Sequence, residues 1–99
     1  MIKVNIKKNH IEIKGHAMYD DYGKDIVCAS ISSIAITTVN AILRLDEKAL
    51  KYREKDGFLI IDVLKESEQT NTLILNMIEL IKELEKEYPK NIKVNEEVH

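Results

Sequence analysis

The sequence predicts an α+β domain whose elements follow the order ββαββαβ. Its antiparallel strands are expected to pack around a central apolar helix, with a second, amphipathic helix alongside. Two observations predict this class. In several short segments apolar residues alternate with polar ones, which is the period of a half-buried strand. Two longer segments repeat their apolar residues every three to four positions, which is the period of a helix.

The N-terminal residues predict a β-hairpin. Residues 2–7 and 10–14 each alternate isoleucine or valine with polar side chains, and Lys8-Asn9 between them suits a tight turn. The isoleucines of both strands should therefore face the core. His10 falls on the other side, in step with charged neighbours, and is expected to lie at the surface.

The segment from Asp25 to about Leu45 predicts the first helix. No charged residue occurs between Asp25 and Arg44, so the helix is apolar around most of its circumference. Such a helix is usually buried on more than one side. We therefore expect it to lie centrally.

The second half of the chain predicts another hairpin, a helix and a last strand. Tyr52–Lys55 and Phe58–Val63 flank Asp56-Gly57, which is a strong two-residue turn signal. An amphipathic stripe from Ser67 to about Tyr88 predicts the second helix, which Pro89 ends. Residues 92–94 form a short final strand.

Composition indicates one soluble domain over residues 1–99. Hydrophobic residues make up 44% and charged residues 32% of the chain, which is ordinary for a globular protein. The formal net charge is −2 and the two signs are interspersed, which argues against a nucleic-acid partner. We expect no membrane span, because no apolar run approaches the length that one needs. The alternating start is unlike a signal peptide. With a single cysteine and no internal disulfide, a cytoplasmic location is expected.

That cysteine, Cys28, stands near the start of the first helix, and His16 ends the second strand twelve residues earlier. If Asp25 caps the helix, Cys28 is its third residue, where the helix dipole favours the thiolate. An imidazole beside it would supply a base. The alternative is that Cys28 is a small core residue, which is the usual role of a lone helical cysteine.

Two nearby polar residues have alternative roles as well. Asp25 either caps the helix only or also orients the imidazole. Ser32 follows Cys28 by four positions and so shares its face, where its hydroxyl either contacts the site or bonds a carbonyl one turn earlier. Backbone N–H groups at the helix start, including that of Cys28, are candidates to hold an oxyanion.

The run Gly15-His16-Ala17, followed by Gly23-Lys24-Asp25-Ile26-Val27-Cys28-Ala29-Ser30-Ile31-Ser32, closely resembles the bacterial ribosomal-processing cysteine protease family, Prp. Chain length and element order fit that family throughout. The chain departs from its pattern at Ser30, where alanine or glycine is common, and in the loop 18–22, which lacks the small residues common there.

The resemblance implies a cysteine endopeptidase that removes the N-terminal extension of a large-subunit ribosomal protein, cutting after a pair of aromatic residues. It makes Cys28 the nucleophile and His16 the base, with Asp25 and Ser32 as supporting polar groups. We expect no cofactor and no metal. The resemblance also points to a homodimer. Two strongly apolar helices in so small a domain leave aliphatic surface to cover, so we expect the interface on strand and second-helix surfaces away from His16 and Cys28; the alternative is a monomer whose sheet covers both helices.

The loop 18–22 should bound the substrate groove. The candidate substrate-binding residues are Tyr19, Tyr22 and the adjoining Gly23. The two tyrosines could stack on aromatic substrate side chains or serve as ordinary loop anchors.

Two other functions compete with the protease. A non-catalytic ribosome-assembly or peptide-binding module would use the same groove without needing the thiol. A metal site would combine His16 and Cys28 with His10 or His99, although structural zinc prefers four ligands and the chain has one cysteine.

Overall fold

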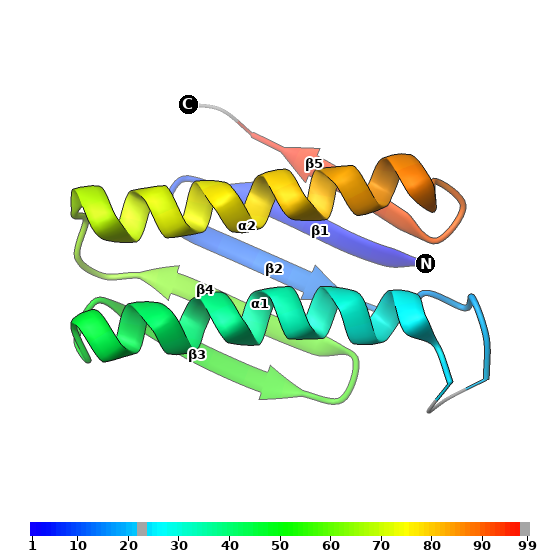
Figure 1. The fold of residues 1–99 in the computed structure, drawn as a ribbon, viewed down its shortest axis with the longest axis horizontal. Helices are drawn as coiled ribbons and strands as arrows, with labels where there is room; N and C mark the ends of the chain where they lie inside the picture. Colours follow the sequence, from blue (N-terminus) through cyan, green and yellow to red (C-terminus); the bar gives the residue numbers. More distant parts are fainter. Residues whose placement is uncertain (22–23, 98–99) are drawn as a thin grey trace.

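The computed structural model describes residues 1–21 and 24–97. One five-stranded sheet has the strand order β3-β4-β2-β1-β5, and two helices connect its parts (Figure 1). In chain order the elements are β1 (Ile2–Lys7), β2 (His10–Lys14), α1 (Ile26–Leu45), β3 (Leu50–Lys55), β4 (Phe58–Val63), α2 (Glu68–Glu87) and β5 (Ile92–Glu96). The predicted α+β class and element order are confirmed.

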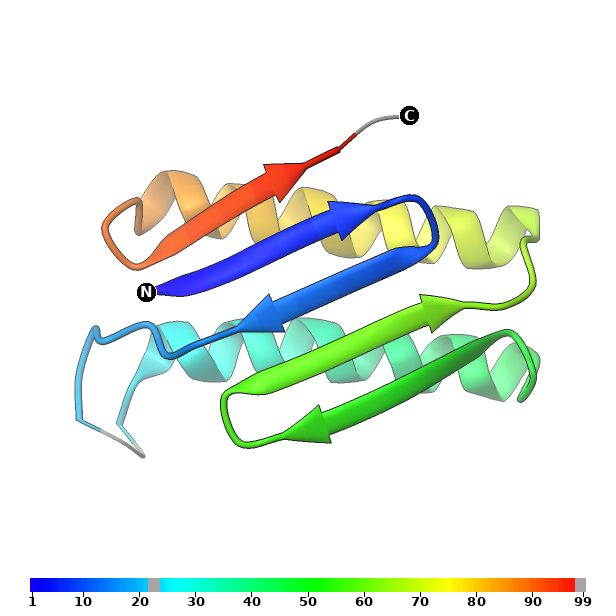
Figure 2. The same cartoon turned by 180° about the vertical axis from the view of Figure 1, so that it is seen from behind.

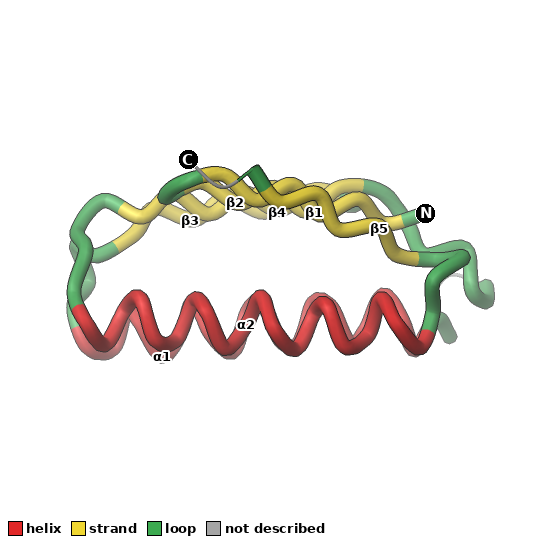
Figure 3. Tube along the Cα trace, turned by 90° about the horizontal axis from the view of Figure 1, so that it is seen from above, coloured by secondary structure: helices red, strands yellow, loops and turns green. Residues whose placement is uncertain are grey.

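The two helices lie side by side on one face of the sheet, and the other face is left open (Figure 3). The sequence analysis expected the strands to pack around α1. Instead they cover it from one side only. One side of α1 is exposed, and its outward stripe carries small or polar residues: Ala29, Ser33, Thr37, Asn40 and Arg44. These side chains tolerate water, so α1 needs cover on its apolar sides only.

Strand β5 pairs with β1 in parallel, whereas antiparallel strands were expected throughout. The reason is the path of α2, which starts beside the end of β4 and runs back along the sheet (Figure 2). The chain therefore enters β5 at the end where β1 also begins, and the two strands run the same way. The other three strand pairs are antiparallel.

The core lies between the sheet and the helices. The isoleucines of β1 and β2 face it as predicted, and Ile42, Ile61, Met77 and Ile81 are among its fully buried side chains. By length and composition α1 could cross a membrane, which corrects the expectation that no apolar run reaches that size. In this structure one side of α1 joins the core, where Val27, Ile31 and four further residues of the helix are buried.

One end of the sheet gathers the loop from β2 to α1 and the β3–β4 turn (Figure 2). The amide of Gly15 donates to the carbonyl of Gly57 at 2.8 Å and joins the two. Gly15 has φ +92, and a Cβ there would lie 2.5 Å from the carbonyl oxygen of Met1. Only glycine fits this bend, which turns the chain out of β2 toward α1.

Candidate active site

Cys28 occupies the third position of α1, as the sequence predicts from an Asp25 cap. Asp25 is the N-cap, and its Oδ1 accepts from the amides of Val27 and Cys28, both at 3.0 Å. The Cys28 thiol is partly buried and free of any disulfide. It lies in the first turn, where the helix dipole favours negative charge on the sulfur.

The second carboxylate oxygen of Asp25 holds the preceding loop. Its Oδ2 accepts from the amides of Tyr19 at 3.0 Å and Asp20 at 3.4 Å. Burial alone would raise the pKa of Asp25, but the amides of Cys28, Tyr19, Asp20 and Val27 outweigh it and lower that pKa. Asp25 therefore stays ionised and ties the loop to the helix start.

The backbone of Ala17 contacts the thiol through its N–H group. Its N–H donates to Cys28 Sγ at 3.2 Å, a contact that favours negative charge on the sulfur. Its carbonyl accepts from the side chain of Asn91 at 2.9 Å. Sequence reasoning missed Asn91, which stands 74 residues away along the chain just before β5, and no local motif marks it.

His16 lies over the β3–β4 turn. A Cβ built on Gly57 would lie 2.9 Å from His16 Nε2, so glycine at this position leaves the space that the imidazole fills. The sequence identified Asp56-Gly57 as a turn but not as the floor beneath His16. No hydrogen bond joins the described side chains of His16 and Cys28, although catalytic hydrogen bonds often form only when substrate is bound.

His16 and Cys28 line one cleft of about 640 Å³. Asp25 and Ser32 line it too, so the structure brings all four predicted polar site residues together. The remaining wall comes from the loop after β2, from α1 and from the β3–β4 turn, with Met18, Asp20, Ala29, Ile36, Glu54, Asp56 and Phe58 among its residues.

The hydroxyl of Ser32 makes no hydrogen bond within the described chain. The hydroxyls that bond a carbonyl one turn earlier are instead those of Ser30, to Ile26 at 2.7 Å, and Thr38, to Ile34 at 2.9 Å. Because Ser32 is exposed and lines the cleft, its hydroxyl is available to a bound molecule.

The loop residues divide into anchors and rim. Tyr19 packs edge-on against Tyr88, with ring centroids 5.4 Å apart, and it is absent from the cleft wall, which favours the anchor role. Tyr22 and Gly23 lie outside the described residues. Met18 is 78% exposed and has φ 58, a left-handed conformation that is unusual for a bulky residue and is common at functional sites.

The expected oxyanion donor at the helix start is not free. The Cys28 amide already donates to Asp25, as does that of Val27. The described N–H group that points at the sulfur from outside the helix is that of Ala17. This corrects the proposed use of the Cys28 amide, because the cap that shapes the helix start also occupies it.

The structure separates the residues of the competing metal site. His10 bonds Asp62 and Glu12 on the sheet and is absent from the wall of the cleft that holds His16 and Cys28. His99 lies outside the described residues. Across residues 1–21 and 24–97, no group of three or more His, Cys, Asp or Glu side chains is placed to hold a metal ion.

Comparison with known proteins gives one consistent result. The family model described as cysteine protease Prp matches residues 1–93. The ribosomal processing cysteine proteases Prp of Staphylococcus aureus and Mycoplasma genitalium are 32% and 31% identical, over 96% and 98% of this chain and 98% and 97% of theirs. The crystal structure of the S. aureus ribosomal processing protease Prp with a covalently linked product peptide superimposes with a TM-score of 0.86 at 25% identity, covering 97% of each chain.

The resemblance drawn from the Gly-His-Ala and Asp-Ile-Val-Cys-Ala runs is thus confirmed over residues 1–93. The cysteine and the histidine of those runs share one cleft, on a fold that matches a protease of this kind. The chain belongs to the Prp family of cysteine proteases.

Proposed function

We propose that this enzyme uses Cys28 and His16 as a catalytic dyad to remove the N-terminal extension of a large-subunit ribosomal protein. The observation that carries the proposal is the placement of the Cys28 sulfur. It lies in the first turn of α1 and accepts a hydrogen bond from the N–H of Ala17 at 3.2 Å. Cys28 also lines the same cleft as His16.

In the first step the Cys28 thiolate attacks the carbonyl carbon of the scissile peptide bond, and the carbonyl π electrons move to oxygen. The C–N bond then breaks as the protonated His16 gives its proton to the leaving amine. A thioester remains on Cys28. The Ala17 amide is the donor best placed to meet the oxyanion, since it already faces the sulfur.

In the second step His16 takes a proton from water, and the resulting hydroxide adds to the thioester carbon. The C–S bond breaks, which releases the new carboxyl terminus and restores the thiolate with the imidazolium. Asp25 holds the loop that carries His16 and Ala17, and Ser32 offers a hydroxyl to the bound peptide. Both are positioning or binding groups.

The ribosomal target is supported by the relatives, which are named ribosomal processing proteases, and by the S. aureus protein, whose structure holds a product peptide. The cleft fits an apolar substrate segment, because Met18, Ile36 and Phe58 contribute to its wall. We infer a preference for aromatic or large apolar residues before the cut. A cytoplasmic location follows from such a substrate.

We also propose that the enzyme is a homodimer joined through α2. Leu75 and Leu80 on that helix are 56% and 38% exposed, and they lie away from the cleft. Exposed leucines of this kind are often covered by a second copy. Light scattering should then give twice the mass of one chain. A monomer mass that does not change with concentration would contradict this.

The function is tested with a synthetic peptide that carries the extension of the ribosomal protein, followed by mass spectrometry. Wild-type enzyme should release one defined product, and Cys28→Ala should release none above the level of buffer alone. A peptide whose aromatic pair is changed to alanine should be cut far more slowly. Normal turnover by Cys28→Ala would exclude the cysteine mechanism.

Ser32 has a matched control two residues earlier. Ser30→Ala removes a hydroxyl that bonds the helix backbone, whereas Ser32→Ala removes one that faces the cleft. We expect Ser32→Ala to raise the KM for the peptide and Ser30→Ala to leave it unchanged. Equal kinetics for both variants would show that Ser32 does not contact the substrate.

A further inference from the structure

The open face of the sheet is strongly basic. Strand side chains alternate between the helix side and this face, and the burial of the alternate residues fixes which side chains point outward. Among the described strand residues, the outward positions hold seven cations and two carboxylates. The cations are Lys3, Lys7, Lys14, Lys51, Arg53, Lys55 and Lys93, and the carboxylates are Glu12 and Asp62.

Four of the lysines stand in one row across the sheet. Lys3 is directly opposite both Lys14 and Lys93, and Phe58 pairs with Lys14 on one side and Lys55 on the other. Like charges on neighbouring strands cost stability. The row crosses all five strands, about 19 Å at the usual strand spacing, with a cation on four of them, and a bound anion would offset this cost.

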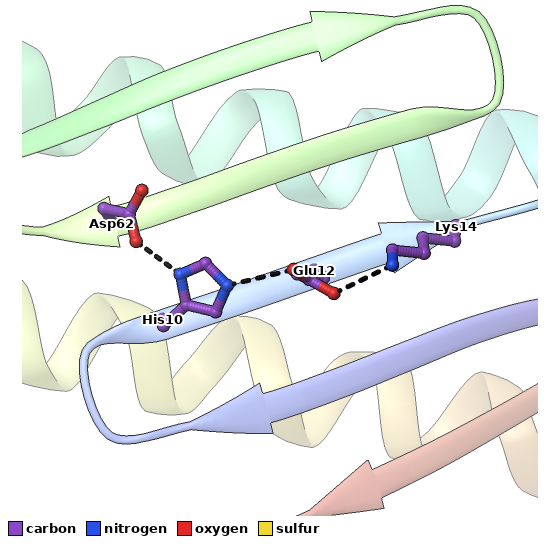
Figure 4. Close-up of polar contacts among 4 residues, drawn as sticks. All are labelled: His10, Glu12, Lys14 and Asp62. Carbon is purple, nitrogen blue, oxygen red and sulfur yellow. Dashed lines mark hydrogen bonds and ion pairs between the residues drawn. The ribbon is translucent and has the colours of Figure 1, made fainter.

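The two carboxylates of the face are already engaged (Figure 4). Asp62 bonds His10, and Glu12 bonds both His10 at 3.1 Å and Lys14 at 3.2 Å. These partners neutralise the acids within their own cluster. In the described chain Lys3, Lys55 and Lys93 pair with no carboxylate, so their charges are left for a ligand.

The lysine row borders the cleft. Lys55 and Phe58 line the cleft wall. Lys14 directly precedes Gly15 and His16, which line it as well. The ammonium of Lys14 lies 5.4 Å from the centre of the Phe58 ring, which holds this lysine at the same end of the sheet. A ligand on the row would therefore lie next to the mouth of the active site.

We propose that the lysine row Lys93, Lys3, Lys14 and Lys55 binds the phosphate backbone of RNA beside the cleft. Three cations on neighbouring strands and a fourth beyond Phe58 fit a chain of repeating negative charges such as a phosphate backbone. A second copy fits poorly, because a two-fold interface on this face would bring lysines against lysines. The binding is independent of the proposed cleavage reaction.

The test uses the full chain and a fluorescently labelled RNA hairpin of about 20 nucleotides, followed by anisotropy between about 50 and 300 mM KCl. The variant Lys3→Gln, Lys14→Gln, Lys93→Gln removes three charges of the row. Its matched control, Lys48→Gln, Lys65→Gln, Lys86→Gln, removes three exposed charges elsewhere. Cys28→Ala should bind RNA as well as wild type, which separates this binding from catalysis.

We expect the row variant to bind RNA at least tenfold more weakly. Its plot of log K against log salt should be less steep than that of wild type, by about two to three in the slope. The control variant should keep wild-type affinity, and neither melting temperature should fall. Absence of RNA binding by wild type at about 50 mM salt, or equal weakening in both variants, would overturn the proposal. So would competition by polyglutamate as effective as unlabelled RNA, or a change of oligomeric state in the row variant alone.

Discussion

Both helices span 20 residues, and in both the N-cap side chain accepts a hydrogen bond from the amide of the third helical residue. In α2 the hydroxyl of Ser67 accepts from Thr70 at 3.1 Å. In α1 the carboxylate of Asp25 accepts from Cys28 at 3.0 Å. The local backbone arrangement is the same, but the surroundings differ.

The α2 cap serves its own helix, and Thr70 behind it is buried. The α1 cap uses its second oxygen on the loop, and Cys28 behind it opens into the cleft. A carboxylate accepts more hydrogen bonds than a hydroxyl, which is why aspartate can hold helix and loop together. Two helix starts with the same local geometry therefore differ in what the cap binds outside its helix: nothing further for Ser67 among the described contacts, and the loop after β2 for Asp25.

Among variants that keep the thiol, the largest effect should come from removing the proposed base, His16, which leaves the helix start of α1 intact. His16→Ala should lower peptide cleavage by about 100-fold or more, the usual contribution of a general base. It should also slow alkylation of Cys28 by iodoacetamide near neutral pH. His10→Ala is the control, because that histidine is absent from the cleft wall. Equal alkylation rates in wild type and His16→Ala would show that the two side chains are not coupled.

The two caps can be compared directly by mutation. Asp25→Asn keeps one acceptor oxygen for the helix but loses the second for the loop, so stability should change by less than about 0.5 kcal/mol while cleavage falls about tenfold, equivalent to about 1.4 kcal/mol. Ser67→Ala should do the reverse and cost about 1 kcal/mol of stability at unchanged activity. The measurements are urea unfolding and peptide kinetics. If Asp25→Asn cleaves normally, the aspartate is only a cap.

Asn91 is a second side chain that holds the loop after β2. It bonds Ala17, whereas Asp25 bonds the loop further along, at Tyr19 and Asp20. Asn91→Ala removes the donor to the Ala17 carbonyl and should slow both cleavage and Cys28 alkylation by about five- to tenfold, as expected for a hydrogen bond worth about 1 kcal/mol. Asn95→Ala is a matched control, because Asn95 donates to Asn5 on the sheet. A loss of stability with unchanged alkylation would reduce Asn91 to a structural role.

The sequence predicted the local structure well because its signals are local. The turn at Asp56-Gly57, the Asp25 cap and the position of Cys28 each depend on a few adjacent residues, and all three are confirmed. The contact of Asn91 with Ala17 depends on how β5 meets β1. The parallel pairing that brings them together leaves no trace in either segment.

Charge shows the same limit. Along β1 the lysines alternate with apolar residues, so the two signs of charge look evenly mixed along the chain. Pleating sends the apolar residues to the core and Lys3 and Lys7 to the open face. The mixed charge of the sequence, which argued against a nucleic-acid partner, therefore coexists with a basic surface that only the sheet register assembles.

The smallest expected effect concerns His10, on the open face of the sheet. Two hydrogen bonds raise the pKa of His10 above 6.5: the one to Asp62 contributes most, and the one to Glu12 contributes less. A raised pKa in the folded state stabilises the protein below about pH 6.5, and this contribution is lost as pH rises through the folded value. Lys7 and Lys51 flank the pair in the register and oppose protonation, and the imidazole is partly exposed.

We therefore expect His10→Gln to lower stability at pH 6 by about 0.5 kcal/mol, the size typical of an exposed ion pair, and to have less effect at pH 9. Urea unfolding at the two pH values measures the difference between wild type and variant. His10→Gln should leave peptide cleavage unchanged, because the cluster does not reach the cleft. A stability difference that grows with pH would contradict the assigned sign and show that His10 is held as the neutral imidazole.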